Sequence, residues 1–520
     1  MISLDYYNGE IIIKSSYDYR DRIKELSFRV WDEVLKVWKT TVNNLDEVIE
    51  KFPEAVLSES LKDFRSHLKK IAAQSRAMES TGAFDLGDFG KGKEILPFQT
   101  AGLEFIEMTG GRALIGDEMG TGKTIQSLAY IQIHPELRPA IIVCPASVKF
   151  NWRNETNQWL TTTENLVVVN KKEDISKASI VIINYDILGK WLPALQAINP
   201  QIIIFDESHV LKNSKAARTK AAVELSKDRR IIALTGTPIL NKPIELFSQL
   251  NIVNPKAYPE NSYFRFAQKY CDAHKTEFGW NFSGASNIKE LAEEIKGLMI
   301  RRTKEQVLPE LPPKRRTKVL LPISNRKYYN EALAEFKEWR AEEEKPDERN
   351  VLEWMETLKQ KCTEGKLEAA KLWVKEFLET GNKLVLFGTH QFTIDFFMKE
   401  FKAVKIDGST SQAERERAVY SFQNDPDTRL FIGNIKAAGV GITLTAASNV
   451  AFIEMDWIPG LHDQAEDRCN RIGQKTSVNC YYLLAEHTLD EDICRMLEKK
   501  REVIEEVLEE TTALNFAFLI

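Results

Sequence analysis

Short apolar runs rich in β-branched residues recur along the chain, and their pattern predicts buried strands. Between about residues 95 and 253 the runs read AIIVCP, SIVIINY, QIIIFDE and RIIALTGTP, and turn and helix signals follow each one. The runs lack a clean alternation of apolar and polar positions, which is typical of strands buried on both faces of a parallel sheet. This part of the chain is therefore expected to form a doubly wound α/β domain.

The same alternation returns in the second half of the chain. The runs KLVLFGT, FKAVKIDG, RLFIGN, NVAFIEM and NCYYLLAE predict a second sheet, and a charged helix is expected from Asp490 to Glu510. Mostly helical segments are expected over residues 255–316 and 325–378. The first of these ends in RRTKEQVLPELPPKRR, which we interpret as an extended connector because of its diproline and basic residues.

The N-terminal region reads differently. A strand is expected over Glu10–Lys14, followed by helical stretches that carry Trp31 and Trp38 on apolar positions, and the segment LDEVIEKFPEAV is also read as helical. The glycine-rich segment STGAFDLGDFGKGKE is interpreted as a linker. The expected parts are an N-terminal domain (1–92), a first lobe (93–255), helical insertions with the connector (256–365), and a second lobe with a C-terminal helix (366–520).

Composition narrows the classes of protein that this chain resembles. No run approaches the roughly 18 consecutive apolar residues of a membrane span, and the first ten residues lack the features of a secretory signal. Six cysteines without a CxxC pair favour a reducing compartment and argue against a structural zinc site. The net charge of −5 argues against a histone-like DNA binder, although a local basic groove remains compatible with it.

The segment LIGDEMGTGKTIQ, residues 114–126, is the first candidate site. Glycine-rich turns followed by Lys and Thr can wrap backbone N–H groups around phosphates, with the lysine on the outer phosphates and the Thr hydroxyl on Mg²⁺. A helix is expected to follow over Ile125–Ile133, with its N-terminus towards the anion. The literal pattern has glycine where this chain has Asp117, so an ordinary glycine-rich turn is the alternative.

Two further motifs have the right order for a nucleotide site. In IIIFDESHVLKN, the pair Asp206 and Glu207 stands at the end of an apolar strand, where Asp can help hold Mg²⁺ and Glu can orient the attacking water. The alternative is that Asp206 only caps a helix. The segment ALTGTP follows at the end of the next expected strand and can couple the nucleotide site to a neighbouring domain.

The segment DQAEDRCNRIGQ contains two arginines, Arg468 and Arg471, with spacing that would place them on one face of a helix. Two guanidiniums on one face suit a transferring phosphoryl group. A surface salt-bridge pair is the alternative interpretation.

Taken in this order, DEMGTGKT, DESH, LTGTP and QAEDRCNRIGQ resemble the Swi/Snf-like branch of superfamily 2 helicases, over about residues 96–484. The resemblance implies two RecA-like lobes with parallel sheets, short helical insertions and a small N-terminal domain. It also implies DNA-dependent hydrolysis of ATP, with Mg²⁺, between the lobes. Asp117 at the first loop position and Ser208 both fit this branch.

The resemblance assigns candidate residues. Those for catalysis are Lys123, Asp206, Glu207, Arg468 and Arg471, with Thr124 and Asp206 for the metal. Those for ATP are Gln99, Asp117, Glu118, Met119, Gly120, Thr121, Gly122, Lys123, Thr124, Gly441, Gln464, Arg468 and Arg471. Those facing DNA, from motifs such as CPASVKFNW, INYDIL, LVLFGTH, KAAGVGITLTAA and EMDWIPG, are Lys149, Asn184, Tyr185, Gly388, Thr389, Lys436, Gly439 and Trp457.

Within this family the chain is most similar to HARP-type annealing helicases, on PASVKFNW and on the N-terminal RVWDEVLKVWK. We therefore expect a monomeric translocase that rewinds or remodels double-stranded or forked DNA, with Arg29, Trp31, Lys36, Trp38 and Lys39 as candidate junction contacts. The alternative for the first 92 residues is a stabilising cap. The alternatives for the whole chain are a strand-unwinding DNA or RNA helicase and a nucleotide-dependent DNA clamp. Short insertions and the absence of a recognisable histone-reading segment favour a cytoplasmic, nucleoid-associated enzyme of a phage or bacterium.

Overall fold

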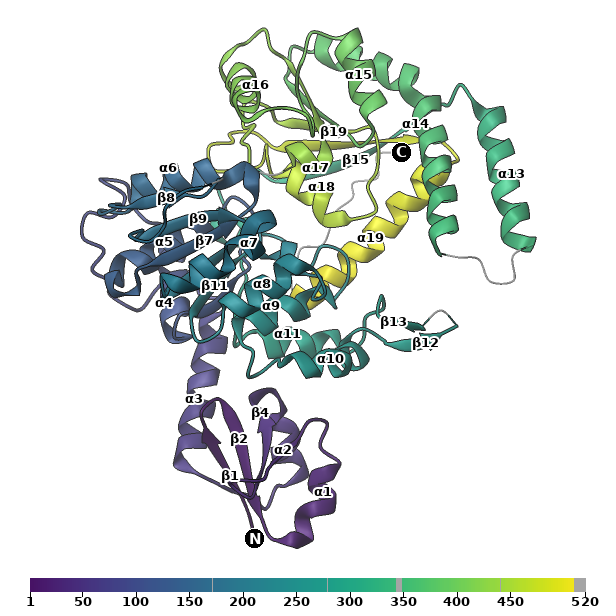
Figure 1. Cartoon of the computed structure of the whole chain (residues 1–520). Coiled ribbons are helices and arrows are strands. Elements are labelled where there is room, and N and C mark those ends of the chain that lie inside the picture. Colours follow the sequence, from purple (N-terminus) through teal and green to yellow (C-terminus); the bar gives the residue numbers. More distant parts are fainter. Residues whose placement is uncertain (171, 278, 343–347, 440, 509–520) are drawn as a thin grey trace. The chain divides into compact units, whose positions relative to one another are not determined.

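A computed structural model describes residues 1–170, 172–277, 279–342, 348–439 and 441–508. The chain divides into two compact units. The first is Met1–Val307 together with the end of the last helix from Ile504, and the second is Leu308–Val503. Figure 1 labels their elements.

The first unit begins with a five-stranded sheet of order β3-β4-β2-β1-β5. Its strands are β1 (Ile2–Tyr7), β2 (Glu10–Ser15), β3 (Val30–Asp32), β4 (Val37–Thr41) and β5 (Val56–Leu57). The helices beside it are α1 (Arg20–Lys24), α2 (Leu45–Lys51) and α3 (Glu59–Gln74). The expected strand over Glu10–Lys14 is confirmed. The expected helix over LDEVIEKFPEAV is confirmed only for its first seven residues, because α2 ends at Lys51 and strand β5 begins at Val56.

The helix expected around Trp31 and Trp38 is wrong, because this segment is the antiparallel hairpin β3–β4. The Asp32 carboxylate accepts hydrogen bonds from the N–H groups of Val34 and Leu35, at 3.0 and 2.8 Å, which closes the turn. Lys36 adopts a positive φ of 55° in the same turn. Side-chain capping of this kind and β-branched flanks favour a hairpin over a helix.

A seven-stranded parallel sheet of order β14-β6-β11-β10-β7-β9-β8 follows in the first unit. The strands are β6 (Arg112–Ile115), β7 (Ala140–Cys144), β8 (Leu166–Val168), β9 (Ile180–Asn184), β10 (Ile202–Asp206), β11 (Arg230–Leu234) and β14 (Met299–Ile300). The helices around it are α4 (Pro97–Met108), α5 (Lys123–Ile133), α6 (Lys149–Trp159), α7 (Tyr185–Ala197), α8 (Ala217–Leu225) and α9 (Glu245–Val253). The predicted parallel sheet and the predicted helix after the glycine-rich loop are confirmed.

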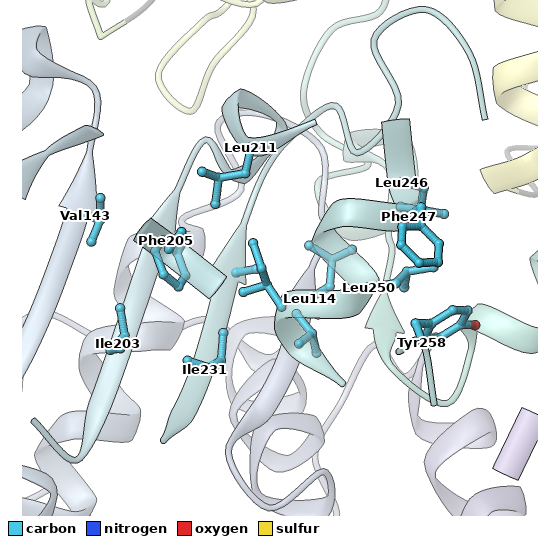
Figure 2. Close-up of a cluster of buried hydrophobic side chains, with 14 of the residues drawn as sticks. Leu114, Val143, Ile203, Phe205, Leu211, Ile231, Leu246, Phe247, Leu250 and Tyr258 are labelled. Atoms are coloured by element: carbon cyan, nitrogen blue, oxygen red, sulfur yellow. The ribbon is translucent and has the colours of Figure 1, made fainter. Parts of the chain in front are cut away.

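The sheet is stabilised by apolar side chains that are buried on both of its faces. Strand positions such as Leu114, Ile203, Phe205 and Ile231 are fully buried. Figure 2 shows them in one cluster with Leu246, Phe247 and Leu250 of α9. Burying such side chains stabilises the fold by about 25 cal/mol per Å² of apolar surface removed from water.

The segment after α9 is only partly helical. It contains α10 (Tyr263–Tyr270), α11 (Ile288–Ile295) and α12 (Lys304–Val307), together with a separate two-stranded hairpin, β12 (His274–Thr276) and β13 (Gly279–Asn281). The expected extended connector (301–316) is therefore extended only in part: α12 lies in its first half, and only its last three residues, 314–316, belong to a strand, β15 (Lys314–Leu321).

The second unit is built on a six-stranded parallel sheet of order β15-β20-β19-β16-β18-β17. Its other strands are β16 (Leu384–Gly388), β17 (Val404–Ile406), β18 (Leu430–Asn434), β19 (Asn449–Phe452) and β20 (Val478–Ala485). The helices are α13 (Arg326–Glu342), α14 (Glu348–Glu379), α15 (Gln391–Glu400), α16 (Gln412–Asn424), α17 (Ile435–Ala438), α18 (Pro459–Glu466) and α19 (Leu489–Leu508). The second predicted α/β lobe is confirmed; residues 509 and 510 of the expected tail helix lie outside the described ranges.

Two properties of the described chain bear on its class. No helix within the described ranges is long and apolar enough to cross a membrane. All six cysteines are buried and carry free thiols. In several of them, such as Cys480, burial raises the pKa of the thiol well above its usual value, which keeps the sulfur protonated and unreactive.

Candidate active site

Three loops of the first unit leave the carboxyl ends of neighbouring strands. The glycine-rich loop (116–122) follows β6, the segment TGTP follows β11, and Asp206 ends β10. Because β6, β11 and β10 are adjacent in the sheet, the three predicted motifs meet at one edge. This is the edge at which open α/β sheets bind ligands.

The glycine-rich loop has a backbone that only glycine adopts easily. Gly120 and Gly122 have φ values of +89° and +85°. A Cβ on Gly122 would lie 2.3 Å from the Gln99 amide nitrogen. Gly122 is also the N-cap residue of α5, and it has no side chain that could cap the first turn. The helix therefore begins directly at the loop. Such a helix start attracts anions.

The ammonium of Lys123 folds back over this loop. Its Nζ donates to the carbonyl oxygens of Asp117 at 2.8 Å and of Glu118 at 3.2 Å. Burial lowers the pKa of Lys123 to about 8, and the carboxylates of Glu207 and Asp117 oppose this shift. A partly desolvated lysine among backbone carbonyls gains from a bound polyanion, because the anion supplies the charge that burial has taken away.

Gln99 braces the loop from α4. Its side-chain oxygen accepts from the N–H of Leu96 at 3.0 Å, and its amide nitrogen donates to the carbonyl oxygen of Thr121 at 2.9 Å. The Thr121 hydroxyl in turn donates to Glu118 at 2.8 Å. Gln99 thus holds the loop in shape; its role in binding ATP stays a prediction.

Asp206 and Glu207 form a partly buried acidic pair. The indole N–H of Trp152 donates to an Asp206 carboxylate oxygen at 2.7 Å. Burial, and next the neighbouring Glu207 carboxylate, raise the pKa of Asp206 to about 7. The Glu207 Oε2 atom is buried without a hydrogen bond among the described residues, and the Nδ1 atom of His209 lies 3.4 Å from it.

The acidic pair is connected to the TGTP loop. The ring of His209, two residues after Glu207, contacts the Thr235 hydroxyl at 3.0 Å. Burial lowers the pKa of His209, so the ring is neutral at physiological pH. A neutral imidazole between a carboxylate and a hydroxyl can pass a displacement of either group to the other.

These residues fit a nucleotide with a divalent cation. Asp206 and Glu207 are two adjacent carboxylates, and, after burial, the repulsion between them raises the pKa of Asp206. A cation held by oxygen ligands would relieve it, and oxygen donors are what Mg²⁺ prefers. Thr124 is the second residue of α5, at the end of the helix that follows the loop.

The expected arginine helix of the second unit is wrong in part. Helix α18 ends at Glu466, and both arginines follow it in an irregular turn. The chain leaves the helix there because the carbonyl oxygen of Arg468 accepts from the N–H of Leu444 at 2.8 Å instead of continuing the helical ladder. The two arginines are therefore presented by a turn and not by one helix face.

Side chains of this turn are held against residues 441–447. The Arg468 Nε atom donates to Gln464 at 3.1 Å, and Arg471 Nη1 donates to the Thr443 hydroxyl at 2.8 Å. Gln464 and Arg468 are buried. Gly441 has a φ of +78°, which favours glycine; Val440 of the same motif lies outside the described ranges.

The candidate DNA residues of the first unit already have structural partners. Lys149 is buried, and its Nζ donates to the carbonyl oxygen of Val169 at 2.9 Å and to Asn170 at 2.7 Å. Asn184 and Tyr185 are buried where β9 meets α7. Their role towards DNA stays a prediction.

The candidates of the second unit follow the ends of β16, β18 and β19. Gly388 ends β16, and the buried Thr389 hydroxyl oxygen makes no hydrogen bond among the described residues. Lys436 is well exposed and pairs with Asp456 at 3.2 Å, next to the half-buried Trp457. At Gly439 a Cβ would lie 2.3 Å from the carbonyl oxygen of Ile435, so the close turn there requires glycine.

Sequence reasoning missed Trp152 and His209 as parts of the site. Trp152 closes the motif CPASVKFNW, and His209 is the last letter of DESH, so both were within view. Nothing in the letters indicates that one side chain reaches Asp206 across the sheet and the other reaches Thr235, since these contacts depend on strand order.

Two family models match the chain in succession. The SNF2-related domain matches residues 98–367, more than half of the chain, and the helicase conserved C-terminal domain matches residues 368–473.

Among similar proteins, the DNA annealing helicase and endonuclease ZRANB3 of Mus musculus is 37% identical over 435 residues, covering 79% of this chain and 40% of the relative. The SWI/SNF-related matrix-associated actin-dependent regulator of chromatin subfamily A-like protein 1 of Xenopus tropicalis is 33% identical over 519 residues, 96% of this chain and 54% of the relative. The chain thus spans about half the length of these curated relatives. A solved Sulfolobus solfataricus SWI2/SNF2 ATPase core in complex with dsDNA aligns with a TM-score of 0.41 and 25% identity, over 83% of this chain and 96% of that one.

Proposed function

The chain belongs to the SNF2-related family of ATP hydrolases, and from this premise we propose that it is a DNA-dependent ATPase that translocates on double-stranded or forked DNA and rewinds or remodels it. The observation that carries the proposal is the meeting of Lys123, the Asp206–Glu207 pair and the TGTP loop at the ends of three adjacent strands. Two similar proteins are named as annealing helicases, which supports rewinding as the product.

In the proposed ATP site, the amides of residues 117–124 and the ammonium of Lys123 bind the phosphates. Glu207 orients the attacking water and accepts its proton. Thr124 and Asp206 would hold Mg²⁺, which supplies positive charge to the phosphate oxygens when bound. The hydrogen bond from the Trp152 indole fixes the orientation of the Asp206 carboxylate at the proposed metal site.

The second lobe completes the proposed reaction. Arg468 and Arg471 stabilise the charge that develops on the transferred phosphoryl group, with Gln464 and Gly441 beside them, and hydrolysis takes place between the lobes. Each cycle moves the lobes along one DNA strand. Contacts to DNA are mainly to phosphates, so the protein reads little base sequence.

A triplex-displacement assay tests movement. A labelled third strand is annealed to a duplex, and its release is followed with ATP or with a non-hydrolysable analogue. We expect release only with ATP, and none by Lys123→Ala, which should also lose ATP turnover while remaining folded. DNA-stimulated turnover without strand release would favour the clamp, and stimulation by RNA but not by duplex DNA would favour an RNA helicase.

Salt dependence gives a second readout of the same proposal. Because Lys and Arg contacts to phosphate release counterions, stimulation by duplex DNA should weaken steeply between about 50 and 200 mM salt. The proposal also includes action as a monomer, in the cytoplasm and on the nucleoid, in replication-fork remodelling or DNA repair.

A further inference from the structure

Arg301 and Arg302 directly follow β14, at the edge of the first parallel sheet. From the sequence they are expected only to begin the extended connector. In the structure the backbone of this segment continues alongside the glycine-rich loop. The N–H of Gly116 donates to Ile300 at 2.8 Å, and that of Glu118 donates to Arg302 at 2.9 Å. The first half of the loop therefore has a paired neighbour along its length.

Arg302 is fully buried and reaches under the loop to Asp117, which is also fully buried. Its Nε donates to one carboxylate oxygen of Asp117 at 3.0 Å, and its Nη2 donates to the other. This two-pronged pairing fixes the orientation of the carboxylate. The Gln126 amide nitrogen donates to the same carboxylate at 3.0 Å.

This contact resolves a conflict in the sequence. Asp117 stands where the ordinary phosphate-loop pattern has glycine, and a free carboxylate there would repel phosphates. The Asp117 side chain is instead neutralised by Arg302 in the interior. A buried carboxylate without its partner is strongly destabilised, so the two residues depend on each other.

Arg301 makes a second connection. Its Nη1 donates to the carbonyl oxygen of Gly116, where the loop begins, and at 2.9 Å to that of Gly236 in the TGTP loop. Gly236 itself lies against Met119: a Cβ at position 236 would be only 3.0 Å from the Met119 Cβ. The guanidinium thus ties together two of the three loops at the candidate site.

We propose that Arg301 and Arg302 are positioning residues for ATP hydrolysis. Arg302 fixes the glycine-rich loop through Asp117, and Arg301 fixes the distance between that loop and the TGTP loop. This inference rests on the proposed ATP site. Neither residue touches the reacting atoms; both act through the loops that do.

The test compares steady-state ATP hydrolysis by the full chain at saturating duplex DNA. Arg302→Lys keeps the positive charge but loses the two-pronged pairing of the guanidinium with Asp117. We expect kcat/KM for ATP to fall on the order of 10²-fold, the usual cost of misplaced reacting groups. Asp117→Asn should cause a similar loss. The double variant should lose little more than either single variant, because both act through one pair.

Arg112→Lys is the matched control. Arg112 begins β6, at the opposite end of the strand that feeds the loop, and it also donates to backbone carbonyls, Val253 at 2.7 Å and Ile252 at 2.9 Å. This variant should lower the melting temperature and leave kcat/KM within about threefold of the wild type. Arg301→Gln, at a half-buried site, provides a variant that keeps the fold if Arg302→Lys does not.

The outcomes separate the two proposals. If Arg302→Lys and Arg301→Gln fold and retain kcat/KM within about threefold, while Lys123→Ala is inactive, the positioning role is refuted and the ATP site stands. If Lys123→Ala hydrolyses ATP normally, the ATP site itself is wrong. Additive losses in the double variant would show that Arg302 and Asp117 do not act through each other.

Discussion

Asp206 is held from two sides by aromatic residues. The Trp152 indole donates to its carboxylate, and the Tyr185 hydroxyl donates to its carbonyl oxygen at 2.6 Å. These two aromatics belong to CPASVKFNW and INYDIL, two motifs that the resemblance places towards DNA. If these motifs bind DNA as the resemblance implies, a displacement of either one reaches Asp206 through a single hydrogen bond, and we expect this route to couple DNA binding to hydrolysis.

Replacement of Arg471 by alanine tests the catalytic contribution of the second lobe. A residue that stabilises only the transition state affects turnover far more than nucleotide affinity. We therefore expect Arg471→Ala to lower kcat by about 10³-fold or more and to leave the affinity for a fluorescent ADP analogue nearly unchanged. Stopped-flow binding and steady-state hydrolysis measure the two quantities.

The control for this variant is Thr443→Val. Arg471 donates to the Thr443 hydroxyl, so its removal also breaks a structural hydrogen bond, and Thr443→Val breaks the same bond with the guanidinium retained. We expect a much smaller loss from this control. Equal losses in both variants, or a loss below about tenfold in Arg471→Ala, would assign Arg471 to structure and leave the transition-state role to Arg468.

At the scale of elements, buried strands were predictable and turns were not. The strands of both parallel sheets stand out because burial on both faces requires continuous apolar runs. The β3–β4 hairpin resembles a helix in the sequence because Trp31, Val34, Val37 and Trp38 are apolar at helical spacing, although Val34 is exposed in the turn. The end of α18 was missed for a different reason: it depends on the Leu444 amide, which is distant in sequence.

The loop after β16 provides an element-scale prediction about pH. The His390 backbone N–H and ring both bond Glu454, which follows β19, and the other ring nitrogen lies 2.9 Å from Glu356 of α14. The hydrogen bond to Glu454 raises the pKa of His390 above its usual value. Stability from the imidazolium is therefore fully present below pH ~6.5 and lost as the pH rises through the raised value.

We expect the difference in melting temperature between the wild type and His390→Gln to shrink as the pH rises from about 6 to 9. His462→Gln is the control with the opposite sign. Burial lowers the pKa of His462 to about 4, so its stabilisation is present at neutral pH and falls as the pH is lowered. Parallel pH profiles for the two variants would contradict the assignment of charge to His390.

At the scale of the whole molecule, the order of motifs predicted the family and the two lobes, and the adjacency of β6, β11 and β10 explains why those motifs meet. The contacts that set their geometry were not predictable. Arg302 reaches residues separated from it by about 180 positions, and such pairing follows from the sheet order and not from any local pattern.

The last prediction concerns the N-terminal domain, because the residues directly after α3 contact Arg301 and Arg302, which hold the glycine-rich loop. The N–H of Arg301 donates to the Ser75 carbonyl at 3.3 Å, and Arg302 Nη1 donates to the Ala77 carbonyl at 2.9 Å. Deletion of residues 1–79 removes both acceptors, whereas deletion of residues 1–57 removes the five-stranded sheet with α1 and α2 and leaves both acceptors in place. We expect the longer deletion to lower ATP hydrolysis by the route that Arg302→Lys takes, and the shorter one to retain it.

The shorter deletion then separates junction recognition from a stabilising cap. Trp31 is 41% exposed beside Trp38 on the hairpin, with ring centroids 5.1 Å apart, and stacking on an unpaired base contributes about 1–3 kcal/mol. If the sheet reads junctions, the 1–57 deletion and Trp31→Ala should both keep duplex-stimulated ATPase and lose strand rewinding on a forked substrate. Aggregation or loss of ATPase in the 1–57 deletion would favour the cap, and rewinding at the full rate by both variants would eliminate the junction role.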